Sequence, residues 1–361
     1  MSKILIFISK PGGGHISLAE ALRDRLKDRH TVELVDPQPA LVHTHYRLVS
    51  RHALWLWAAE FRHSDTPARS RVAHRTYATL VSHSIESALS SAKPDLVIST
   101  YPFLTSEVTH AMQRLERKTP FVMLLSDPNG VHQAWLTERQ ATAVFAPTRE
   151  TYAQAISAGF PLPALHLTGW PVRAQFYRSS PYARQETLSG LGLDPDHFTV
   201  FLQGGGEGAA RFVRTVEAVL AVPGVQVILA TGTNSKLFNR IRGMPRLFAL
   251  PFKPEIAAYM AAADVVMGKA GPNMLFEAVT LGKPFLATAY IPGQEQANLE
   301  FIQRYGLGWV ALDTRAQTEL IQLLVSSPSR LGKMQASVNA YRSWNTECVE
   351  SIVPLLEDLL I

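Results

Sequence analysis

The sequence has little cysteine and no long hydrophobic runs. Among its 361 residues there is one cysteine, Cys348, so neither an intrachain disulfide nor a cysteine-rich zinc site can form. Fully apolar stretches such as Ala53–Ala59 fall far short of the about 18 to 20 residues that cross a bilayer. The apolar start, Ile4–Ile8, is too short for a signal peptide. We therefore expect a protein of a reducing compartment, neither secreted nor membrane-spanning.

Charge is also scarce, and it is not evenly distributed along the chain. Charged residues make up 18% of the sequence and hydrophobic residues 47%, a balance that excludes intrinsic disorder. The formal net charge is +5, which favours anionic ligands or surfaces but cannot separate nucleic acid, nucleotide and lipid. A chain of this length predicts about two domains.

Short apolar runs of strand length alternate with amphipathic helical stretches along the chain. This alternation is typical of βαβ units, in which helices cover both faces of a parallel sheet. The rhythm stops near Gly169–Pro171, crosses Ser179–Pro181 and restarts in a second glycine-rich half. We therefore expect an α/β protein of two doubly wound, Rossmann-like domains that face each other across a cleft. The expected domains are residues 1–175 and residues 182–338. The last helical stretch, 340–361, could pack back on the first domain or stay with the second.

A glycine run with a histidine, Gly12-Gly13-Gly14-His15, follows the first strand and opens a helix. Backbone N–H groups without side chains around them, together with a helix N-terminus, would then face the ligand, and His15 would be held beside them. A glycine-rich turn with a helix-start histidine is the alternative. Neither the dinucleotide-binding spacing nor a P-loop is present.

The second half carries further candidate ligand loops. Gly204–Gly208 repeats the strand-to-glycine arrangement, although tight turns remain the alternative. Gly268–Asn273 follows a strand, and its amides can cradle a diphosphate. Glu277 lies one turn into the next helix, where it could hold ribose hydroxyls or simply be favoured by the helix dipole. Gln294-Glu295 suits hydrogen bonding to sugar hydroxyls, and the alternative is that the two are ordinary polar residues at the start of a helix.

The order and spacing of these motifs resemble glycosyltransferases of the GT-B fold. The resemblance is strongest to monogalactosyldiacylglycerol synthases and processive diacylglycerol glucosyltransferases, which are relatives of the peptidoglycan enzyme MurG. It covers residues 3–312. The motifs that carry it are Gly12–His15, Ser126–Asn129, Phe145–Thr148, Gly169–Val172, Gly204–Gly208, Lys269–Pro272, Glu277-Ala278 and Ile291–Glu295.

The resemblance implies a role for individual residues. His15 would deprotonate the acceptor hydroxyl, with Asp127 close to it in the N-terminal half of the cleft. The implied donor-binding residues are Gly14, Gly205, Gly206, Phe252, Gly271, Pro272, Glu277, Gln294 and Glu295. Of these, Gly205, Gly206, Gly271 and Pro272 would hold the diphosphate. Glu277 would hold the ribose, the backbone near Phe252 the uracil, and the Gln-Glu pair the sugar. The implied reaction displaces UDP from a UDP-α-hexose in one inverting step.

The sequence departs from the family pattern in two places. Asn273-Met274 stand where a Gly-Thr pair is usual, so a hydroxyl near the diphosphate is lost. Ile16 stands where these lipid enzymes commonly carry arginine, which puts acceptor or anionic-lipid contacts there in doubt. Asp194-Pro195-Asp196 resembles the metal-binding Asp-x-Asp of the other glycosyltransferase class, but we read it as an acidic turn before a strand and expect no metal or other cofactor.

Basic residues and aromatic rings are concentrated in His43–His83. This segment has six arginines against Glu60 and Asp65, together with Trp55, Trp57 and Phe61. Such a mixture is typical of a segment that inserts rings into a membrane surface and pairs arginines with lipid phosphates. The alternative is an ordinary buried helix with solvated arginines. The candidate contact residues are Arg47, Arg51, Trp55, Trp57, Phe61 and Arg62.

We therefore expect an inverting glycosyltransferase that moves galactose or glucose from a UDP-hexose to diacylglycerol. It would act as a peripheral protein on the cytoplasmic face of a membrane, with anionic lipids and no nucleic acid among its partners, since no nucleic-acid motif is present. Two alternatives remain. One is a MurG-like transfer of N-acetylglucosamine to a lipid-linked acceptor, and the other is a non-catalytic UDP-sugar- or lipid-binding protein, against which the intact His15 weighs.

Overall fold

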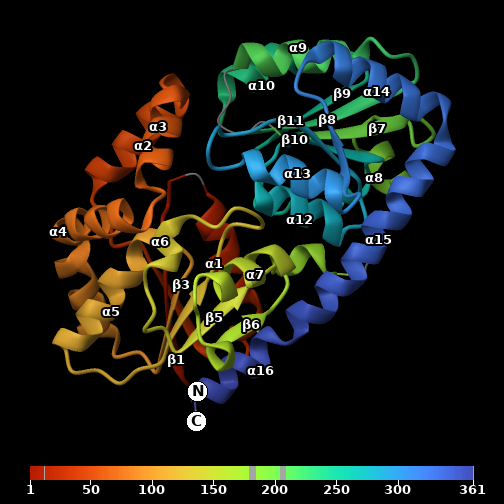
Figure 1. The fold of residues 1–361 in the computed structure, drawn as a ribbon. Helices are drawn as coiled ribbons and strands as arrows, with labels where there is room; N and C mark the ends of the chain where they lie inside the picture. The colour runs from red at the N-terminus through yellow and green to blue at the C-terminus, as the bar shows by residue number, and fades with distance from the viewer. Residues whose placement is uncertain (12, 179–183, 204–208, 361) are drawn as a thin grey trace. The chain divides into compact units, whose positions relative to one another are not determined.

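The computed structural model describes residues 1–11, 13–178, 184–203 and 209–360, with the side chains of 50–52 and 209–211 excepted. Contacts between residues divide the chain into two compact units (Figure 1). The first comprises residues 1–174, 292–294 and 344–361, and the second comprises residues 175–291 and 295–343. The expected linker at Ser179–Pro181 lies outside the described residues.

The first unit is built on a six-stranded parallel sheet in the order β2-β1-β3-β4-β5-β6. Its strands are β1 Lys3–Phe7, β2 Thr31–Val35, β3 Leu96–Ser99, β4 Phe121–Leu124, β5 Ala143–Ala146 and β6 Leu165–Leu167. The central strands are apolar along their whole length because helices cover both faces, and Ile4 to Phe7 are fully buried. Edge strand β2 is more polar, in keeping with its one-sided pairing.

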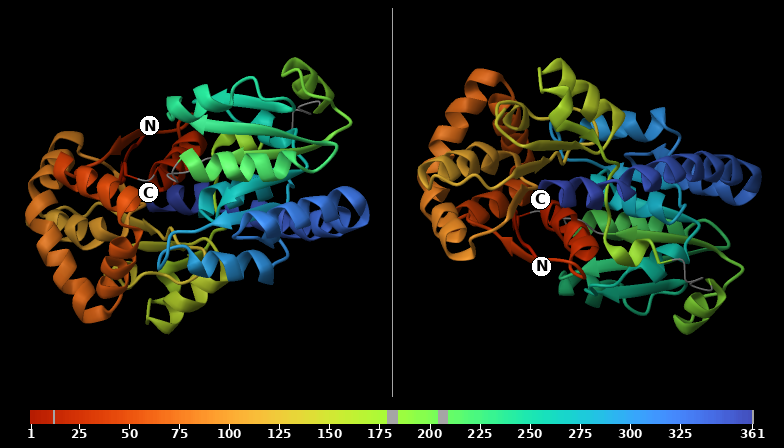
Figure 2. Two further views of the ribbon diagram at one scale, coloured as in Figure 1. Left: turned by 90° about the horizontal axis from the view of Figure 1, so that it is seen from above. Right: turned by 90° about the horizontal axis from the view of Figure 1, so that it is seen from below.

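The helices of the first unit follow its strands in right order for a doubly wound fold. They are α1 Gly14–Leu26, α2 Ala40–His52, α3 Leu54–Ser64, α4 Pro67–Ala92, α5 Thr105–Arg114, α6 Gln133–Leu136, α7 Arg149–Ser157 and α16 Ile352–Glu357. Short 3₁₀ turns lie at η1 Pro102–Leu104, η2 Leu162–Ala164, η3 Ala174–Phe176 and η4 Asp358–Leu360. The orange helices α2, α3 and α4 gather on one side of this unit in both views of Figure 2. They are an insertion between β2 and β3.

The core of the first unit lies between the sheet and helices α4 and α5. Leu5 and Phe7 of β1 belong to one buried cluster with Val81 and Ile85 of α4 and with Val108 of α5. Helix α4 starts sharply because Thr66 Oγ1 accepts the N–H of Arg69 and Pro67 occupies the first helical position.

The second unit repeats the architecture with sheet order β12-β11-β10-β7-β8-β9, again all parallel. Its strands are β7 Phe198–Gln203, β8 Val225–Gly232, β9 Leu247–Pro251, β10 Val265–Lys269, β11 Phe285–Ala289 and β12 Gly308–Val310. Its helices are α8 Arg184–Gly190, α9 Ala209–Leu220, α10 Ser235–Ile241, α11 Ala257–Ala261, α12 Pro272–Thr280, α13 Gln296–Arg304, α14 Thr314–Ser326 and most of α15 Pro328–Glu350. Its core joins Val200 and Leu202 of β7 to Val216 of α9 and Ile321 of α14.

The end of α15 belongs to the first unit, where it anchors a buried tryptophan. Asn345 accepts the N–H of Trp170 at 2.7 Å, and its Nδ2 donates to the carbonyl of Trp170 at 3.1 Å. Gly169 has φ of +68°, and a Cβ there would lie 2.7 Å from the carbonyl oxygen of Asn345. Trp170 is fully buried. Residues 344–361 therefore complete the first unit although they follow the whole of the second.

The predicted α/β architecture is confirmed, with two Rossmann-like sheets of parallel strands. One feature differs from the sequence expectation, because the last helical stretch is broken into α15 and α16 at Ser351. Among the residues that the structure describes, no helix is long and apolar enough to cross a membrane.

Candidate active site

The glycine loop between β1 and α1 holds His15 in a fixed position. Gly13 adopts φ of +73°, a left-handed conformation that suits glycine, and α1 begins at the next residue, Gly14. The ring of His15 donates from Nδ1 to the carbonyl oxygen of Thr100 at 2.6 Å and packs edge-on against Tyr101. Thr100 Oγ1 in turn donates to the carbonyl of His15 at 3.2 Å. Both backbone and side chain of the histidine are thus attached to the end of β3.

The imidazole of His15 is a neutral proton acceptor. Because the carbonyl of Thr100 can only accept, the ring proton sits on Nδ1, and Nε2 carries the lone pair. The side chain is partly exposed, but desolvation by the surrounding protein lowers the pKa of His15 to about 4. The hydrogen bond to Thr100 raises this pKa and offsets the shift only in part. At neutral pH, Nε2 can therefore take a proton from a bound hydroxyl.

Asp127 lies in the loop that follows β4. Burial raises the pKa of its carboxyl to about 7, while the N–H of His132, which donates to Oδ2 at 3.4 Å, works in the opposite direction. Hydroxyls at the start of α7 hold the loop: Thr151 donates to the carbonyl of Asp127 at 2.8 Å, and Thr148 to that of Pro128 at 2.7 Å. The carboxyl is therefore poised between two protonation states near neutrality.

His15 and Asp127 lie at the same edge of the first sheet. His15 follows β1 and Asp127 follows β4, and β3 separates these two parallel strands. Two strand spacings correspond to about 10 Å. The end of β3, Thr100-Tyr101, fills the space between and contacts His15. The two predicted catalytic residues thus belong to one carboxyl edge, and the role of Thr100 could not be read from the sequence because it lies 85 residues from His15.

In the second unit, predicted donor residues follow the carboxyl ends of strands β9 and β10, which belong to one parallel sheet. Gly271 caps α12 directly after β10, and Pro272 occupies its first helical position. Phe252 follows β9 and is 67% exposed. Strand β10 pairs with β7, so the loop after Gln203 starts beside Gly268. Gly205 and Gly206 themselves lie outside the described residues, but Gln203 Oε1 is a buried oxygen without a hydrogen-bond partner in the described part of the chain.

Glu277 is buried within α12. It is 3% exposed and is the sixth residue of the helix, whose first turn contains no acidic residue. The helix dipole acts mainly within the first turn, so it gives little reason for a carboxylate at this position. The helix dipole therefore does not explain this carboxylate, and ribose binding by Glu277 stays a prediction.

The carboxylate of Glu295 has a protein partner that the sequence analysis missed. Its Oε1 forms an ion pair with the ammonium group of Lys269 at the end of β10, and its Oε2 accepts the N–H of Ile291 at 2.8 Å. Glu295 is 4% exposed. The pair lies against Gly271, where a Cβ would come within 3.2 Å of the Lys269 nitrogen. Glu295 and Lys269 therefore shape the loop at Gly271 that is predicted to hold the diphosphate, and the contact of Glu295 with the sugar remains a prediction.

Gln294 differs from its neighbour. It groups with the first unit, whereas Glu295 groups with the second. Its side-chain oxygen is buried and has no hydrogen-bond partner among the described residues. A buried acceptor of this kind is costly unless it is paired, so it is suited to a ligand hydroxyl, as the sequence analysis predicted.

The predicted membrane contact residues fall into two groups. Trp55 is 74% exposed on α3, whereas Trp57 is partly buried edge-on against Tyr46, and Phe61 packs on the ring of His132. Arg47 donates to Thr44 within α2, and Arg62 to the carbonyl of Ala58 within α3. The side chain of Arg51 lies outside the described part of the structure.

Three further apolar side chains of α2 and α3 are exposed in addition to Trp55. Leu41 is 73% and Leu48 57% exposed, two helical turns apart on α2, and Leu54 of α3 is 41% exposed. They were not predicted, because leucines in a helix are normally assigned to the core. The open apolar group of α2 and α3 therefore consists of Leu41, Leu48, Leu54 and Trp55.

Asp194-Pro195-Asp196 forms a local turn. Asp194 Oδ1 accepts the N–H of Asp196 at 2.9 Å, and its Oδ2 lies 2.8 Å from His197 Nδ1. Within the described ranges, no three or more histidine, cysteine, aspartate or glutamate side chains come together as a metal-binding group. The turn therefore gives the carboxylate of Asp194 local partners before β7.

Chelation provides a direct test of the expectation that no metal is needed. We expect transfer activity to be unchanged by EDTA, because helix termini and backbone amides are assigned to the phosphates. The measurement compares initial rates before and after chelation and after adding Mn²⁺. If EDTA abolishes activity, Mn²⁺ restores it, and Asp194→Asn no longer responds to Mn²⁺, the turn binds a catalytic cation and the expectation is wrong.

The two halves of the chain match the models of two known protein families. Residues 15–172 match the family model described as monogalactosyldiacylglycerol (MGDG) synthase, and residues 199–339 match the glycosyltransferase family 28 C-terminal domain. A probable chloroplastic MGDG synthase of Nicotiana tabacum is 28% identical over 85% of this chain. MGDG synthase 3 of Arabidopsis thaliana is 28% identical over 97%. The chain spans 61% of the tobacco protein and 80% of the Arabidopsis protein.

Solved structures share the fold across the whole chain. Anabaena HepE, solved in complex with UDP-glucose, superposes with a TM-score of 0.61 at 18% identity, covering 99% of this chain and 100% of that one. MurG of Acinetobacter baumannii superposes with a TM-score of 0.63 at 14% identity and the same coverage. The chain is therefore a glycosyltransferase with the GT-B fold, whose N-terminal half matches the MGDG synthase family model and whose C-terminal half matches the model of the glycosyltransferase family 28 C-terminal domain.

Proposed function

We propose that this protein transfers a hexose, galactose or glucose, from a UDP-sugar to the free hydroxyl of diacylglycerol. The observation that carries the proposal is the neutral imidazole of His15, held by Thr100 in the tautomer that accepts a proton at Nε2. The MGDG synthase family match over residues 15–172 supports the acceptor, and UDP-glucose in HepE supports the donor class.

The proposed reaction is a single displacement. The acceptor oxygen forms a bond to C1 of the sugar as the bond from C1 to the diphosphate oxygen breaks, and the hydroxyl proton passes to His15 Nε2. Attack on the face opposite the leaving UDP inverts the anomeric centre and gives a β-glycoside. Ionised Asp127 supports the positive charge that develops on the imidazole, and the amides at the start of α12 stabilise the departing diphosphate.

A donor-by-acceptor assay tests the proposal. UDP-galactose, UDP-glucose and UDP-N-acetylglucosamine, each radiolabelled, are incubated with diacylglycerol vesicles or with a lipid-linked peptidoglycan precursor, and the products are separated by thin-layer chromatography. We expect label from a UDP-hexose in a neutral glycerolipid with a β-linkage. Label only in the precursor would favour a MurG-like enzyme, and binding without transfer would favour a non-catalytic protein.

The acceptor is insoluble in water, so the proposal includes contact with a membrane, on its cytoplasmic face. The open apolar group of α2 and α3 supports this, since Leu41, Leu48 and Trp55 present side chains that a lipid surface would bury. Arg47 and Arg62 lie on the same helices. Each such charge near an anionic surface contributes about 1 kcal/mol.

Liposome sedimentation separates the apolar and charged contributions. Charge reversal at Arg47, Arg51 and Arg62 should weaken binding mainly at low salt, because charge attraction is screened within a Debye length. Replacing Leu48 and Trp55 with alanine should weaken binding at every salt concentration, because apolar burial is not screened.

Leu323→Ala serves as the matched control, since this leucine is 38% exposed in the second unit. Circular dichroism confirms that each variant is folded. Parent-like sedimentation of both folded variants on anionic vesicles would mean that α2 and α3 are not the membrane contact.

A further inference from the structure

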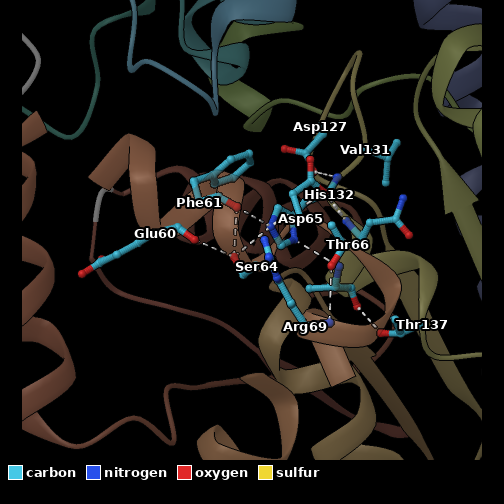
Figure 3. A network of polar contacts seen from close by, with 12 residues as sticks. Glu60, Phe61, Ser64, Asp65, Thr66, Arg69, Asp127, Val131, His132 and Thr137 are labelled. Carbon is cyan, nitrogen blue, oxygen red and sulfur yellow. Dashed lines mark hydrogen bonds and ion pairs between the residues drawn. The ribbon is translucent and has the colours of Figure 1, made fainter. Parts of the chain in front are cut away.

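His132 is a buried histidine between α3 and the loop of Asp127, and the proposed reaction gives it no role. It is 2% exposed. Its backbone N–H donates to Asp127 Oδ2 at 3.4 Å, and its ring lies 4.6 Å from the ring of Phe61. Figure 3 shows the imidazole between Asp127 and the last turn of α3. One residue thus contacts both a candidate catalytic carboxyl and the helix that carries Trp55.

The hydrogen bonds of the ring define its tautomer. Nδ1 accepts the backbone N–H of Ala134 at 3.0 Å, which caps α6, so Nδ1 carries no proton. The proton of the neutral ring then sits on Nε2, which lies 3.2 Å from Ser64 Oγ and 3.4 Å from the carbonyl of Phe61. Burial lowers the pKa of His132, so this neutral form persists at physiological pH.

A second connection runs in parallel with the ring. Asp65, directly after α3, accepts the backbone N–H of Gln133 at 2.9 Å. Ser64 also donates to the carbonyls of Glu60 and Phe61 at 3.0 Å, so its hydroxyl belongs to the end of α3. The end of α3 and residues 132–134 are therefore joined by side-chain hydrogen bonds from both directions.

We propose that His132 is a positioning residue that joins the last turn of α3 to Asp127, so that the placement of the Asp127 carboxyl depends on how α3 is held. The inference rests on the proposed function, in which Asp127 acts beside His15 and α3 contacts the membrane. Docking of α3 on a lipid surface would then steady the carboxyl that serves the lipid acceptor.

The charged groups around His132 belong to three other elements. Asp65 Oδ1 lies 3.9 Å from Nε2, and Asp127 faces the backbone N–H. His74 of α4 donates to the carbonyl of Ala134 at 3.1 Å and pairs with buried Glu107 of α5. The N–H of Ala134 is thus held by His132 and its carbonyl by His74. We therefore expect movement of α3 to reach the Asp127 loop rather than to be absorbed at α6.

Two substitutions break the connection from its two ends. His132→Asn keeps an N-cap acceptor for Ala134, since asparagine is a good N-cap, but its shorter side chain loses Ser64 and Phe61. Ser64→Ala removes the hydroxyl from α3 and leaves His132 in place. Ser82→Ala is the matched control, because Ser82 is also partly buried and donates within its own helix, to Ala78 at 2.7 Å.

Amide hydrogen exchange of residues 127–132 tests the connection without substrate or membrane. Ser64→Ala should speed this exchange about fivefold, the factor that corresponds to the loss of one net hydrogen bond. In the His132→Asn background it should add nothing, and Ser82→Ala should leave exchange unchanged. Equal effects of Ser64→Ala in both backgrounds, or none in either, would overturn the proposal.

Kinetics test whether the connection serves the reaction. His132→Asn and Ser64→Ala should each lower kcat about fivefold to tenfold on diacylglycerol vesicles, with the KM for the UDP-sugar unchanged, and Ser64→Thr should restore the rate. The acidic limb of kcat, set by an Asp127 pKa of about 7, should move to lower pH as water reaches the loosened carboxyl.

The outcomes separate the two proposals. A parent protein that glycosylates no diacylglycerol would refute the proposed function, while the exchange measurement would still decide the connection. Changed exchange with parent-like kcat and pH profile, or kcat losses matched by Ser82→Ala, would show that His132 only caps α6.

Discussion

Replacing His15 with alanine should lower turnover by at least about a hundredfold, the usual scale for the loss of a general base. The structure supplies the reason: Thr100 holds the ring through Nδ1, so the basic atom is the one that alanine removes. The affinity for UDP should change little, because the residues predicted to hold the ribose and the uracil, Glu277 and Phe252, belong to the second unit. Calorimetry with UDP and initial rates with the full substrate pair should therefore diverge.

The pH dependence of the parent sharpens this expectation. A histidine with a pKa of about 4 is neutral above that pH and protonated below it, so its loss as a base should set in only in acid. His83→Ala, an exposed histidine on α4, is the matched control and should keep full activity. Near-normal transfer by His15→Ala would remove this residue from the mechanism and shift attention to Asp127.

Replacing Glu277 with alanine should weaken UDP binding itself by about 2 kcal/mol, since the predicted charge-assisted contact to the ribose would form before chemistry begins. Turnover at subsaturating donor should fall in parallel, which distinguishes this variant from His15→Ala. The measurement is calorimetric titration of UDP into the folded variant.

Burial of Glu277 calls for a second variant. Because the side chain is 3% exposed, alanine leaves a cavity, whereas Glu277→Gln keeps the volume and removes only the charge. The glutamine variant should still lose about tenfold in UDP affinity, and Glu300→Gln, an exposed glutamate on α13, should lose nothing. Parent-like affinity in a folded Glu277→Gln protein would make this residue a helix component only.

The fold and the outline of the site could be predicted from the sequence because both depend on local patterns. Buried parallel strands give unbroken apolar runs such as Ile4–Phe7, and the strand-glycine-helix order places His15 at a carboxyl edge. The pattern of apolar residues and the position of the glycines can each be read within a few residues. The same patterns gave the correct α/β class in both halves.

The groups that tune the site could not be predicted, because they are distant in the sequence. Thr100, which fixes the tautomer of His15, is 85 residues away, and Ser64 is 68 residues from His132. The ion pair of Lys269 with Glu295 joins two loops of one sheet edge. The carboxylate of Glu295, which was predicted to contact a sugar, therefore already has partners within the protein.

The anchoring of Trp170 by Asn345 has a consequence for synthesis on the ribosome. The first unit includes residues 344–361, so the ribosome completes all the strands of this unit long before it reaches Asn345. Until then, and so throughout translation of the second unit, the backbone N–H and carbonyl of Trp170 lack Asn345, their hydrogen-bond partner. Trp170 is fully buried in the complete protein. Truncations and mutations near the C-terminus should consequently damage the half that carries His15, not the half to which most of α15 belongs.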